Sequence, residues 1–321
     1  MSDIRYYTAD QVREALPMAN AIDAMRFAFG ELSAGRVQQP QRAVVPSEHG
    51  AVTLVMSGRC DVRFGLGAKI VSVFPGNRAK GKPTIHAMVV LLDDETGEPV
   101  ALIDGESLTA IRTGAASGLA TDLLARPDAS TVAIVGAGAQ ARTQLEAVCA
   151  VRDVRRVAVC ARSTASAQRM VADVRGADWL ANANVEVADS VSAAVDGVDI
   201  ICTATNSTVP ILRGVDVQTG AHVNAVGSFA PVMQELDLDL VRSAFIVVDH
   251  RPAALAEAGE IIRALDAGVK SEGDLVEIGE LVNERVEVPS DGAQTTIFKS
   301  VGVAVQDLVA GAWIVARGRT G

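Results

Sequence analysis

Residues 131–141 read TVAIVGAGAQA, and this segment is the most informative about the architecture of the chain. Its first five residues form a short apolar run typical of a fully buried strand, and a glycine-rich turn then opens a helical pattern. The spacing Gly136-x-Gly138-x-x-Ala141 matches the strand-turn-helix fingerprint of dinucleotide-binding domains. Gly136 suits the tight turn, Gly138 lets the main chain approach a pyrophosphate, and Ala141 permits close contact between helix and strand. The free N–H groups of the helix start would hold the phosphates.

Short β-rich runs recur downstream of this loop, and helical segments separate most of them. Six strands that alternate with helices predict a doubly wound parallel sheet, the Rossmann type of α/β fold. Near Thr296 we expect the chain to leave this α/β unit, and the apolar-rich helix at 301–316 could pack back on the first domain. The predicted strands are 131–135, 157–160, 185–187, 199–203, 222–226 and 245–249.

The first third of the chain has a different hydrophobic pattern, which predicts a mixed or antiparallel sheet backed by helices. Thr8 and Gln11 have the spacing of a capping box, so a short helix should begin there and stop near Pro17. A second helix carries apolar residues at helical spacing and is closed by Gly35. Strands are expected at 52–56, 67–74, 85–92 and 100–103, and a helix at 107–124.

These patterns predict two domains, in keeping with a length of 321 residues. Residues 1–118 and 300–321 would form a discontinuous α+β domain for substrate binding and dimerisation. Residues 119–299 would form the Rossmann dinucleotide-binding domain.

Composition excludes several classes of protein. A hydrophobic fraction of 49% argues against intrinsic disorder. A net charge of −10, with no block of Lys or Arg, argues against a nucleic-acid or anionic-membrane partner. No apolar run reaches 18 residues and the N-terminus lacks the pattern of a secretory leader, so we expect a cytoplasmic protein. Neither the four cysteines, which suit a reducing compartment, nor the four histidines have metal-ligand spacing, so no metal is expected.

The end of the second Rossmann strand should show which dinucleotide is bound. NAD-binding domains carry an acidic residue there for the ribose 2′-hydroxyl, whereas this chain has Arg162, Ser163 and Thr164. Arg162 can pair with a 2′-phosphate, and the two hydroxyls can donate hydrogen bonds to it. NADP(H) is therefore favoured, and NAD(H) stays possible because the arginine could simply be solvated.

Five segments, taken in order, resemble the ornithine cyclodeaminase/mu-crystallin family over nearly the whole chain. The resemblance implies homodimers in which the first domain, joined by the C-terminal helix, builds the dimer and the substrate site. It also implies ornithine cyclodeamination, alanine dehydrogenation or reduction of ketimino acids, and some members act mainly as ligand-binding proteins. The segments are 67–71, 108–117, 136–141, Val226-Gly227-Ser228 with Pro231 and Glu235-Leu236-Asp237, and 298–302.

By this resemblance, the substrate carboxylate would be met by Arg42, Lys69 and Arg112, with Thr84 nearby. Guanidinium forks and an ammonium are the groups that a desolvated carboxylate requires. A lysine within an apolar strand can also simply extend its ammonium to solvent, so Lys69 has a structural alternative. On the cofactor side, the resemblance implies contacts from Gln140, Ala141, Thr203, Ala225, Val226 and Ser300.

One departure from the family pattern bears on the reaction. Cyclodeaminases and some alanine dehydrogenases of the family have an Asp where this chain has Phe229, and a Phe can neither accept a proton from an ammonium nor pair with it. We therefore expect NAD(P)H-dependent reduction of an α-imino acid, cyclic or linear, to an L-amino acid. Lys69 and Arg112 would be the catalytic pair, with Lys69 as general acid or, alternatively, as an electrostatic anchor while water delivers the proton. The alternatives are amino acid deamination of the ornithine cyclodeaminase or alanine dehydrogenase type, and NADPH-dependent binding of a small ligand.

Overall fold

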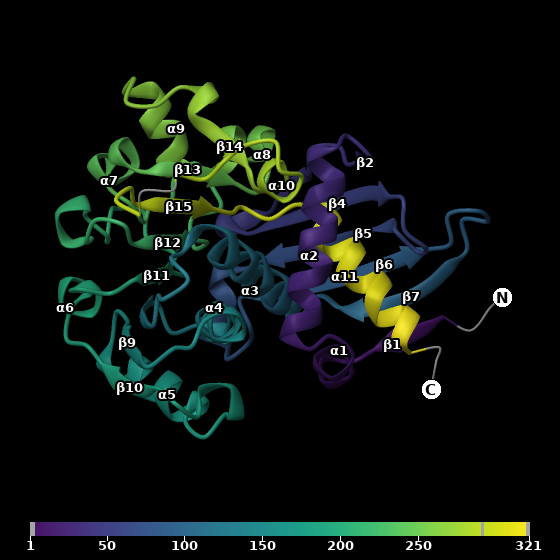
Figure 1. The fold of residues 1–321 in the computed structure, drawn as a ribbon. Coiled ribbons are helices and arrows are strands. Elements are labelled where there is room, and N and C mark those ends of the chain that lie inside the picture. The colour runs from purple at the N-terminus through teal and green to yellow at the C-terminus, as the bar shows by residue number, and fades with distance from the viewer. Residues whose placement is uncertain (1–3, 290–291, 319–321) are drawn as a thin grey trace. The chain divides into compact units, whose positions relative to one another are not determined.

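The computed structural model describes residues 4–289 and 292–318, and its elements are labelled in Figure 1. The chain divides into two compact units, here called unit 1 (Met1–Arg112 with Val303–Gly321) and unit 2 (Thr113–Gly302). The domain boundaries expected after residues 118 and 299 fall inside helix α3 (Gly105–Leu124) and at the end of strand β15 (Thr296–Lys299). The N-terminal expectation of no leader rests partly on residues 1–3, which lie outside the described residues.

Unit 1 is built on a seven-stranded mixed sheet, as predicted. The strand order is β1-β7-β6-β5-β4-β2, with β3 also paired to β4, and β1 with β7 is the parallel pair. Strands β1, β2 and β3 were not predicted, because two to four residues are too few to show a period. The strands are β1 (Arg5–Tyr7), β2 (Val37–Gln38), β3 (Ala43–Pro46), β4 (Val52–Cys60), β5 (Leu66–Val73), β6 (Ile85–Leu92) and β7 (Pro99–Asp104).

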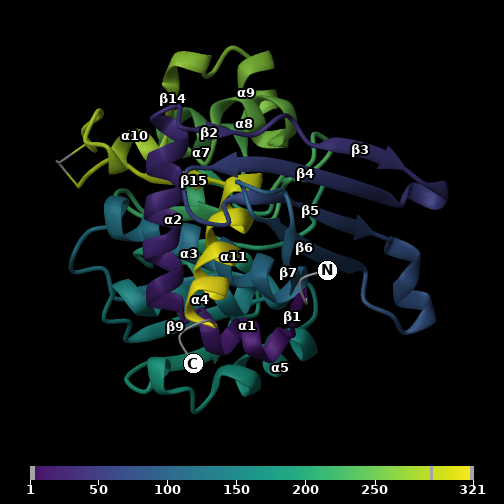
Figure 2. The same ribbon diagram turned by 90° about the vertical axis from the view of Figure 1, so that its right-hand side faces the viewer.

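Three helices lie wholly in unit 1 among the described residues, and α3 begins there. Helix α1 (Ala9–Ala15) has the predicted capping box, with both Thr8 and Gln11 bonds present. Helix α2 (Met18–Ser33) is followed by Gly35 at φ +74°, the left-handed conformation that favours glycine. Helix α11 (Ala304–Arg317), from the far end of the chain, packs against α2 and against β4, β5 and β6, and Figure 2 shows α2 and α11 side by side. The expected return of the C-terminal helix to the first part of the chain is confirmed.

Unit 2 is a doubly wound parallel sheet, which confirms the Rossmann prediction. Its eight strands run in the order β10-β9-β8-β11-β12-β15-β13-β14, and every pairing is parallel. The first five strands of this order repeat the 3-2-1-4-5 arrangement of dinucleotide-binding sheets. The strands are β8 (Thr131–Val135), β9 (Arg156–Cys160), β10 (Asn184–Val187), β11 (Ile200–Thr203), β12 (His222–Ala225), β13 (Phe245–Val248), β14 (Leu275–Glu277) and β15 (Thr296–Lys299).

The six predicted strands leave out β14 and β15, and the chain leaves unit 2 after Gly302 and not near Thr296. Residues 296–299 form β15, which lies between β12 and β13 near the centre of the sheet. Only four residues long, β15 comes shortly before the apolar helix α11, so the sequence pattern merges the two elements. The chain therefore crosses the sheet once more before it returns to unit 1.

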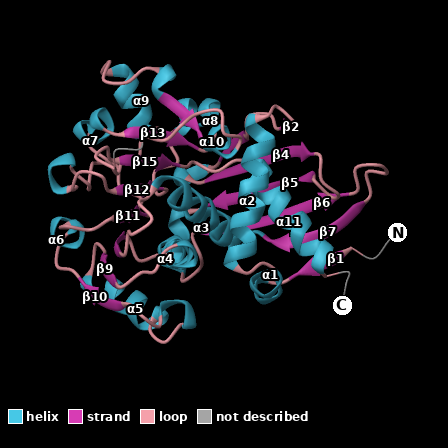
Figure 3. Ribbon diagram, viewed as in Figure 1, coloured by secondary structure: helices cyan, strands magenta, loops and turns pink. Residues whose placement is uncertain are grey.

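Helices flank the strands of unit 2 (Figure 3). Apolar clusters fill both faces of its sheet. In β8, Ala133 and Val135 belong to one cluster, and Val132 and Ile134 belong to the other. Such two-sided burial explains why its strands read as continuous apolar runs. Besides α3, the helices are α4 (Ala139–Val151), α5 (Thr164–Val174), α6 (Val191–Val195), α7 (Leu238–Ser243), α8 (Arg251–Glu257), α9 (Gly259–Asp266) and α10 (Ile278–Val282).

Short 3-10 turns occur in both units, at η1 (Glu48–Gly50), η2 (Pro75–Lys80), η3 (Asp178–Leu180), η4 (Gly214–Asp216) and η5 (Glu272–Asp274). Within the described ranges, no helix combines the length and the apolar character needed to span a bilayer.

Candidate active site

Lys69 is a buried charge in the sheet of unit 1. It lies in β5, where side chains alternate between the two faces, and it is 2% exposed while the neighbouring Ile70 is 50% exposed. The Lys69 Nζ donates to Oδ1 of Asp307 at 3.2 Å and lies 3.4 Å from Oδ2. The lysine is therefore held by a carboxylate of α11 and does not extend its ammonium to solvent.

Arg112 shares the same carboxylate. From α3, its Nε donates to Oδ1 of Asp307 at 3.2 Å, and its Nη1 donates to Oε1 of Gln306 at 2.8 Å. Arg112 is 5% exposed and Asp307 is fully buried. We call Lys69, Arg112 and Asp307 the buried charge cluster. Two cations share one anion there, and since an unbalanced charge in a protein interior is costly, the cluster suits a bound anion.

The electrostatics of Lys69 follow from this arrangement. Burial is the largest effect and lowers the pKa of Lys69 to about 8; Asp307 opposes it, and the charges of Arg112 and Arg42 lower the pKa further. Arg42 is half-buried just before β3, so its charge acts on the cluster. An amine with a pKa of about 8 can give up a proton near neutral pH.

Thr84, the fourth predicted substrate residue, lies in the turn before β6. It is partly buried, and its carbonyl accepts a hydrogen bond from the N–H of Phe74 at 2.7 Å. Its side chain does not belong to the buried charge cluster.

Asp307 and Gln306 were missed by the sequence reasoning. The available signal was that Asp307 is the single charged residue in the apolar run 301–316. Charged residues are rarely fully buried unless they are paired, so a lone carboxylate in an apolar helix indicates a buried cation on another element.

In unit 2, the glycine-rich loop has the geometry that a pyrophosphate requires. Gly136, directly after β8, has φ +126°, and a side chain there would collide with the carbonyl oxygen of Ala204 after β11. Gly138 is the N-cap of α4 with no side-chain cap, and a Cβ there would meet nothing within 4 Å. The main chain is thus exposed where the N–H groups of a 13-residue helix begin.

The first turn of α4 carries the other two predicted residues of this loop. Ala141 is fully buried in the cluster that joins α4 to the sheet. The Oε1 of Gln140 is buried with no hydrogen-bond partner among the described residues. The glycine geometry, the uncapped helix start and the strand order together fit a dinucleotide.

Arg162, Ser163 and Thr164 follow the end of β9, and all three are exposed. Ser163 is the N-cap of α5, where its Oγ accepts from the N–H of Ser166 at 3.3 Å. Thr164 is the first residue of that helix, so a phosphate beside Arg162 would also face a helix N-terminus.

The remaining predicted residues lie at the carboxyl ends of three adjacent strands. Thr203 ends β11, Ala225 ends β12 and is followed by Val226, and Ser300 follows β15. Two of them are engaged by buried carboxylates that were not predicted as site residues. The Thr203 Oγ1 donates to Oε2 of Glu235 at 2.9 Å. The Ser300 Oγ donates to Oδ2 of Asp249 at 2.8 Å.

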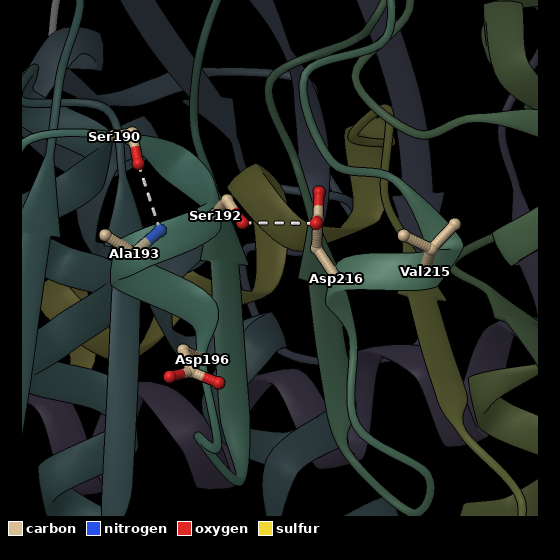
Figure 4. A pocket seen from close by; sticks show the side chains of 6 residues that line it. All are labelled: Ser190, Ser192, Ala193, Asp196, Val215 and Asp216. Carbon is tan, nitrogen blue, oxygen red and sulfur yellow. Dashed lines mark hydrogen bonds between the residues drawn. The ribbon is translucent and has the colours of Figure 1, made fainter.

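A cavity of about 410 Å³ lies elsewhere on unit 2 (Figure 4). Asp216 faces it, accepting from Ser192 Oγ at 3.1 Å and pairing with Arg213 at 2.7 Å. The cavity contains none of the predicted site residues and no buried unpartnered group, so we assign it no role. Its lining is Ser190, Ser192, Ala193, Asp196, Val215 and Asp216.

Within residues 4–289 and 292–318, no group of three His, Cys, Asp or Glu side chains could hold a metal ion. Burial raises the pKa of the Cys60 thiol to about 11 and those of Cys149 and Cys202 to about 12, so these thiols stay protonated.

Comparison with known proteins decides the family. The model of the ornithine cyclodeaminase/mu-crystallin family matches residues 4–320. The chain belongs to this family. The resemblance inferred from the sequence motifs is thereby confirmed.

Relatives of this family member have matching lengths. Δ1-Pyrroline-2-carboxylate reductase of Bacillus cereus strain ATCC 10987 is 37% identical over 313 residues, which cover 97% of this chain and 95% of the relative. The structure of Thermococcus litoralis Δ1-pyrroline-2-carboxylate reductase in complex with NADH and L-proline is 32% identical, with a TM-score of 0.93 and coverage of 99% and 98%. An archaeal alanine dehydrogenase dimer with bound NAD is 30% identical, with a TM-score of 0.92 and coverage of 99% and 96%.

Proposed function

We propose that this family member reduces an α-imino acid to an L-amino acid with NAD(P)H. A cyclic ketimine such as Δ1-pyrroline-2-carboxylate is the substrate that we favour, ahead of a linear imino acid. The observation that carries the proposal is the buried charge cluster, in which Lys69 and Arg112 share the single anion Asp307. A substrate carboxylate would supply the missing negative charge. Relatives named for reduction of this imine support the choice of substrate.

Arg112 is the primary carboxylate ligand in this proposal. Its guanidinium has five N–H donors, and the bonds to Asp307 and Gln306 engage two of them. Two of the other donors can form a fork to a carboxylate. Arg42, whose charge already acts on Lys69, adds a second guanidinium. Thr84 lies outside the buried charge cluster, and a hydroxyl contact from it to the substrate rests on the family resemblance alone.

Reduction of the C=N bond needs a hydride at carbon and a proton at nitrogen. A bound reduced nicotinamide supplies the hydride. Lys69 supplies the proton from its ammonium, whose pKa of about 8 makes the transfer feasible at neutral pH. Arg112 and Arg42 fix the carboxylate and so hold the imine in one orientation, which is a major source of rate. If Lys69 serves only as an anchor, water donates the proton instead.

The N-terminus of α4 with Gly136, Gly138, Gln140 and Ala141 would hold the pyrophosphate. Arg162, Ser163 and Thr164 would hold a 2′-phosphate, which favours NADP(H) over NAD(H), although the similar solved structures contain NADH or NAD. The strand ends at Thr203, Ala225, Val226 and Ser300 would meet the nicotinamide half of the dinucleotide.

A homodimer is part of the proposal. On the sheet face opposite Lys69, Ile70 and Met88 are direct cross-strand neighbours and are 50% and 45% exposed. Exposed apolar side chains side by side on a sheet favour a protein partner. A second copy of this chain is the occupant we propose, since a similar alanine dehydrogenase is a dimer.

The decisive experiment follows NADPH and NADH oxidation by absorbance against cyclic and linear imino acids. Ornithine and alanine, each with NAD⁺, serve as controls. Turnover of an imino acid supports the proposal. Ammonia release from ornithine, or oxidation of alanine alone, would favour the deaminating alternatives, against which Phe229 argues because it cannot accept a proton. NADPH binding without turnover of any compound would instead indicate a ligand-binding protein.

A further inference from the structure

Glu235 is a fully buried carboxylate at the carboxyl edge of the unit 2 sheet. From the end of β11 it accepts three hydrogen bonds, from Thr203 Oγ1 at 2.9 Å, Thr205 N–H at 2.7 Å and Thr205 Oγ1 at 2.8 Å. From the turn after β12 it accepts two more, from the N–H groups of Gly227 at 2.8 Å and Ser228 at 3.2 Å. One side chain therefore ties together two separate loops.

The two loops are packed against each other at Gly227. A Cβ at this position would collide with the backbone nitrogen and oxygen of Thr205 and with Oε1 of Glu235. The main chain of one loop thus lies directly on the other. Because both of its oxygens are used, a change at Glu235 must release donors on one loop or both.

Behind Glu235, two further buried charges complete the arrangement. The Lys299 Nζ lies 3.0 Å from Oε1 of Glu260, and both side chains are fully buried. Burial is the largest effect on Glu235 and raises the pKa of its carboxyl group. The positive charge of Lys299 lowers this pKa, and the negative charge of Glu260 raises it. Lys299 ends β15, the strand next to β12, which places this support under the same edge of the sheet.

We propose that Glu235 is a positioning residue that shapes the nicotinamide half of the dinucleotide site by fixing the loops after β11 and β12. This inference rests on the proposed dinucleotide binding. A Rossmann sheet holds one mononucleotide on each half, outside the carboxyl ends of the strands. Since the glycine-rich loop and Arg162 belong to β8 and β9, the adenosine half lies there, and the loops that Glu235 ties belong to the other half.

The test uses the full chain and two probes, NADH and ADP, with dissociation constants from calorimetry. Glu235→Gln keeps the size of the side chain but turns one acceptor into a donor that faces N–H groups. We expect the Kd for NADH to rise at least about tenfold, and the Kd for ADP to change less than about twofold. ADP lacks the nicotinamide ribose, so a selective effect locates the change in one half of the site.

Asp199→Asn is the matched control. Asp199 also collects hydrogen bonds on a carboxylate, from Arg126 Nη2, Ser130 N–H, Thr131 N–H and Thr131 Oγ1. Ser130 and Thr131 lie at the start of β8 and Arg126 precedes them, so this carboxylate is at the amino ends of the strands, opposite the dinucleotide edge. The control should lower the melting temperature and leave both dissociation constants unchanged.

Equal NADH affinity in Glu235→Gln and the parent chain would overturn the inference, as would an equal loss for NADH and ADP. If Glu235→Gln does not fold, Thr205→Val is the test, because it removes one hydroxyl donor from the loop after β11. We expect the affinity for NADH to fall about threefold and the affinity for ADP to stay unchanged. An unchanged affinity for NADH would overturn the inference. A parent chain that binds neither NADH nor NADPH would contradict the proposed function itself. If the parent chain binds NADH and Glu235→Gln binds it equally well, only the role of Glu235 is contradicted.

Discussion

Lys69 Nζ lies 3.2 Å from Oδ1 of Asp307, although 238 residues separate the two in the sequence. The contact joins β5 to the C-terminal helix α11 inside unit 1. It keeps the lysine buried and leaves the cluster with one cation more than it has anions. The substrate proposal and the stability of unit 1 both depend on this contact.

Removing the shared carboxylate should destabilise unit 1. In Asp307→Asn, Lys69 and Arg112 would become two buried cations with no anion between them, so the free energy of unfolding should fall by about 3–5 kcal/mol. Urea denaturation measures this loss. Asp10→Asn, which removes an exposed ion pair with Arg13, is the control and should change little. A loss in Asp307→Asn no larger than that of the control would contradict the pairing.

The pH dependence of turnover should report the proton donor. Lys69 has a lowered pKa of about 8, so it is protonated below that pH and loses its proton above it. If Lys69 is the general acid, kcat/KM for imine reduction, which reports the groups of the free enzyme, should stay level below about pH 8 and fall as the pH rises further. Steady-state kinetics across that range give the profile.

Lys69→Met separates the two roles of this lysine. A general acid predicts a lower kcat and loss of the alkaline limb, whereas an anchor predicts a higher KM with kcat unchanged. Unchanged turnover with weaker binding would therefore rule out proton donation by Lys69.

Arg112→Lys tests the carboxylate fork. The lysine keeps the charge but cannot bond to Asp307, Gln306 and a carboxylate in one plane. We expect kcat/KM for the imino acid to fall by about 10- to 100-fold, with the Kd for NADH unchanged. A loss of dinucleotide affinity of similar size would argue that Arg112 does not bind the imino acid.

Arg162→Gln tests the preference for NADP(H). Arg162 is exposed after β9, beside the N-terminus of α5, so its loss should cost little stability. The Kd for NADPH should rise at least about tenfold while that for NADH stays within about twofold. Equal effects on both dinucleotides would mean that the arginine does not meet a 2′-phosphate.

Charged residues on the exposed sheet face should separate the proposed dimer. The double variant Ile70→Asp with Met88→Asp places two carboxylates side by side on that face. We expect a monomer by sedimentation where the parent is a dimer. Val215→Asp, at an apolar position on unit 2 that is 83% exposed, should keep the assembly of the parent. A double variant that remains dimeric would place the interface on another surface.

Features that depend on near neighbours along the chain could be predicted from the sequence. The buried strand, glycine turn and helix start at 131–141, and the capping box at Thr8, are built from contacts within a few residues. These sequence patterns can therefore be recognised without a structure. The predicted residues Lys69 and Arg112 came from motif resemblance, which records the chemistry of a site and not its contacts.

Features that depend on residues distant in the sequence became visible in the folded structure. The insertion of β15 between β12 and β13 is a long-range strand pairing that no local hydrophobic period predicts. Likewise, Asp307, which pairs with Lys69, and Glu235, which joins two loops, were not predicted as site residues. The position of a carboxylate in the sequence does not indicate which residue it will pair with. Burial makes such pairing obligatory, and the fold alone selects which cation or N–H group satisfies it.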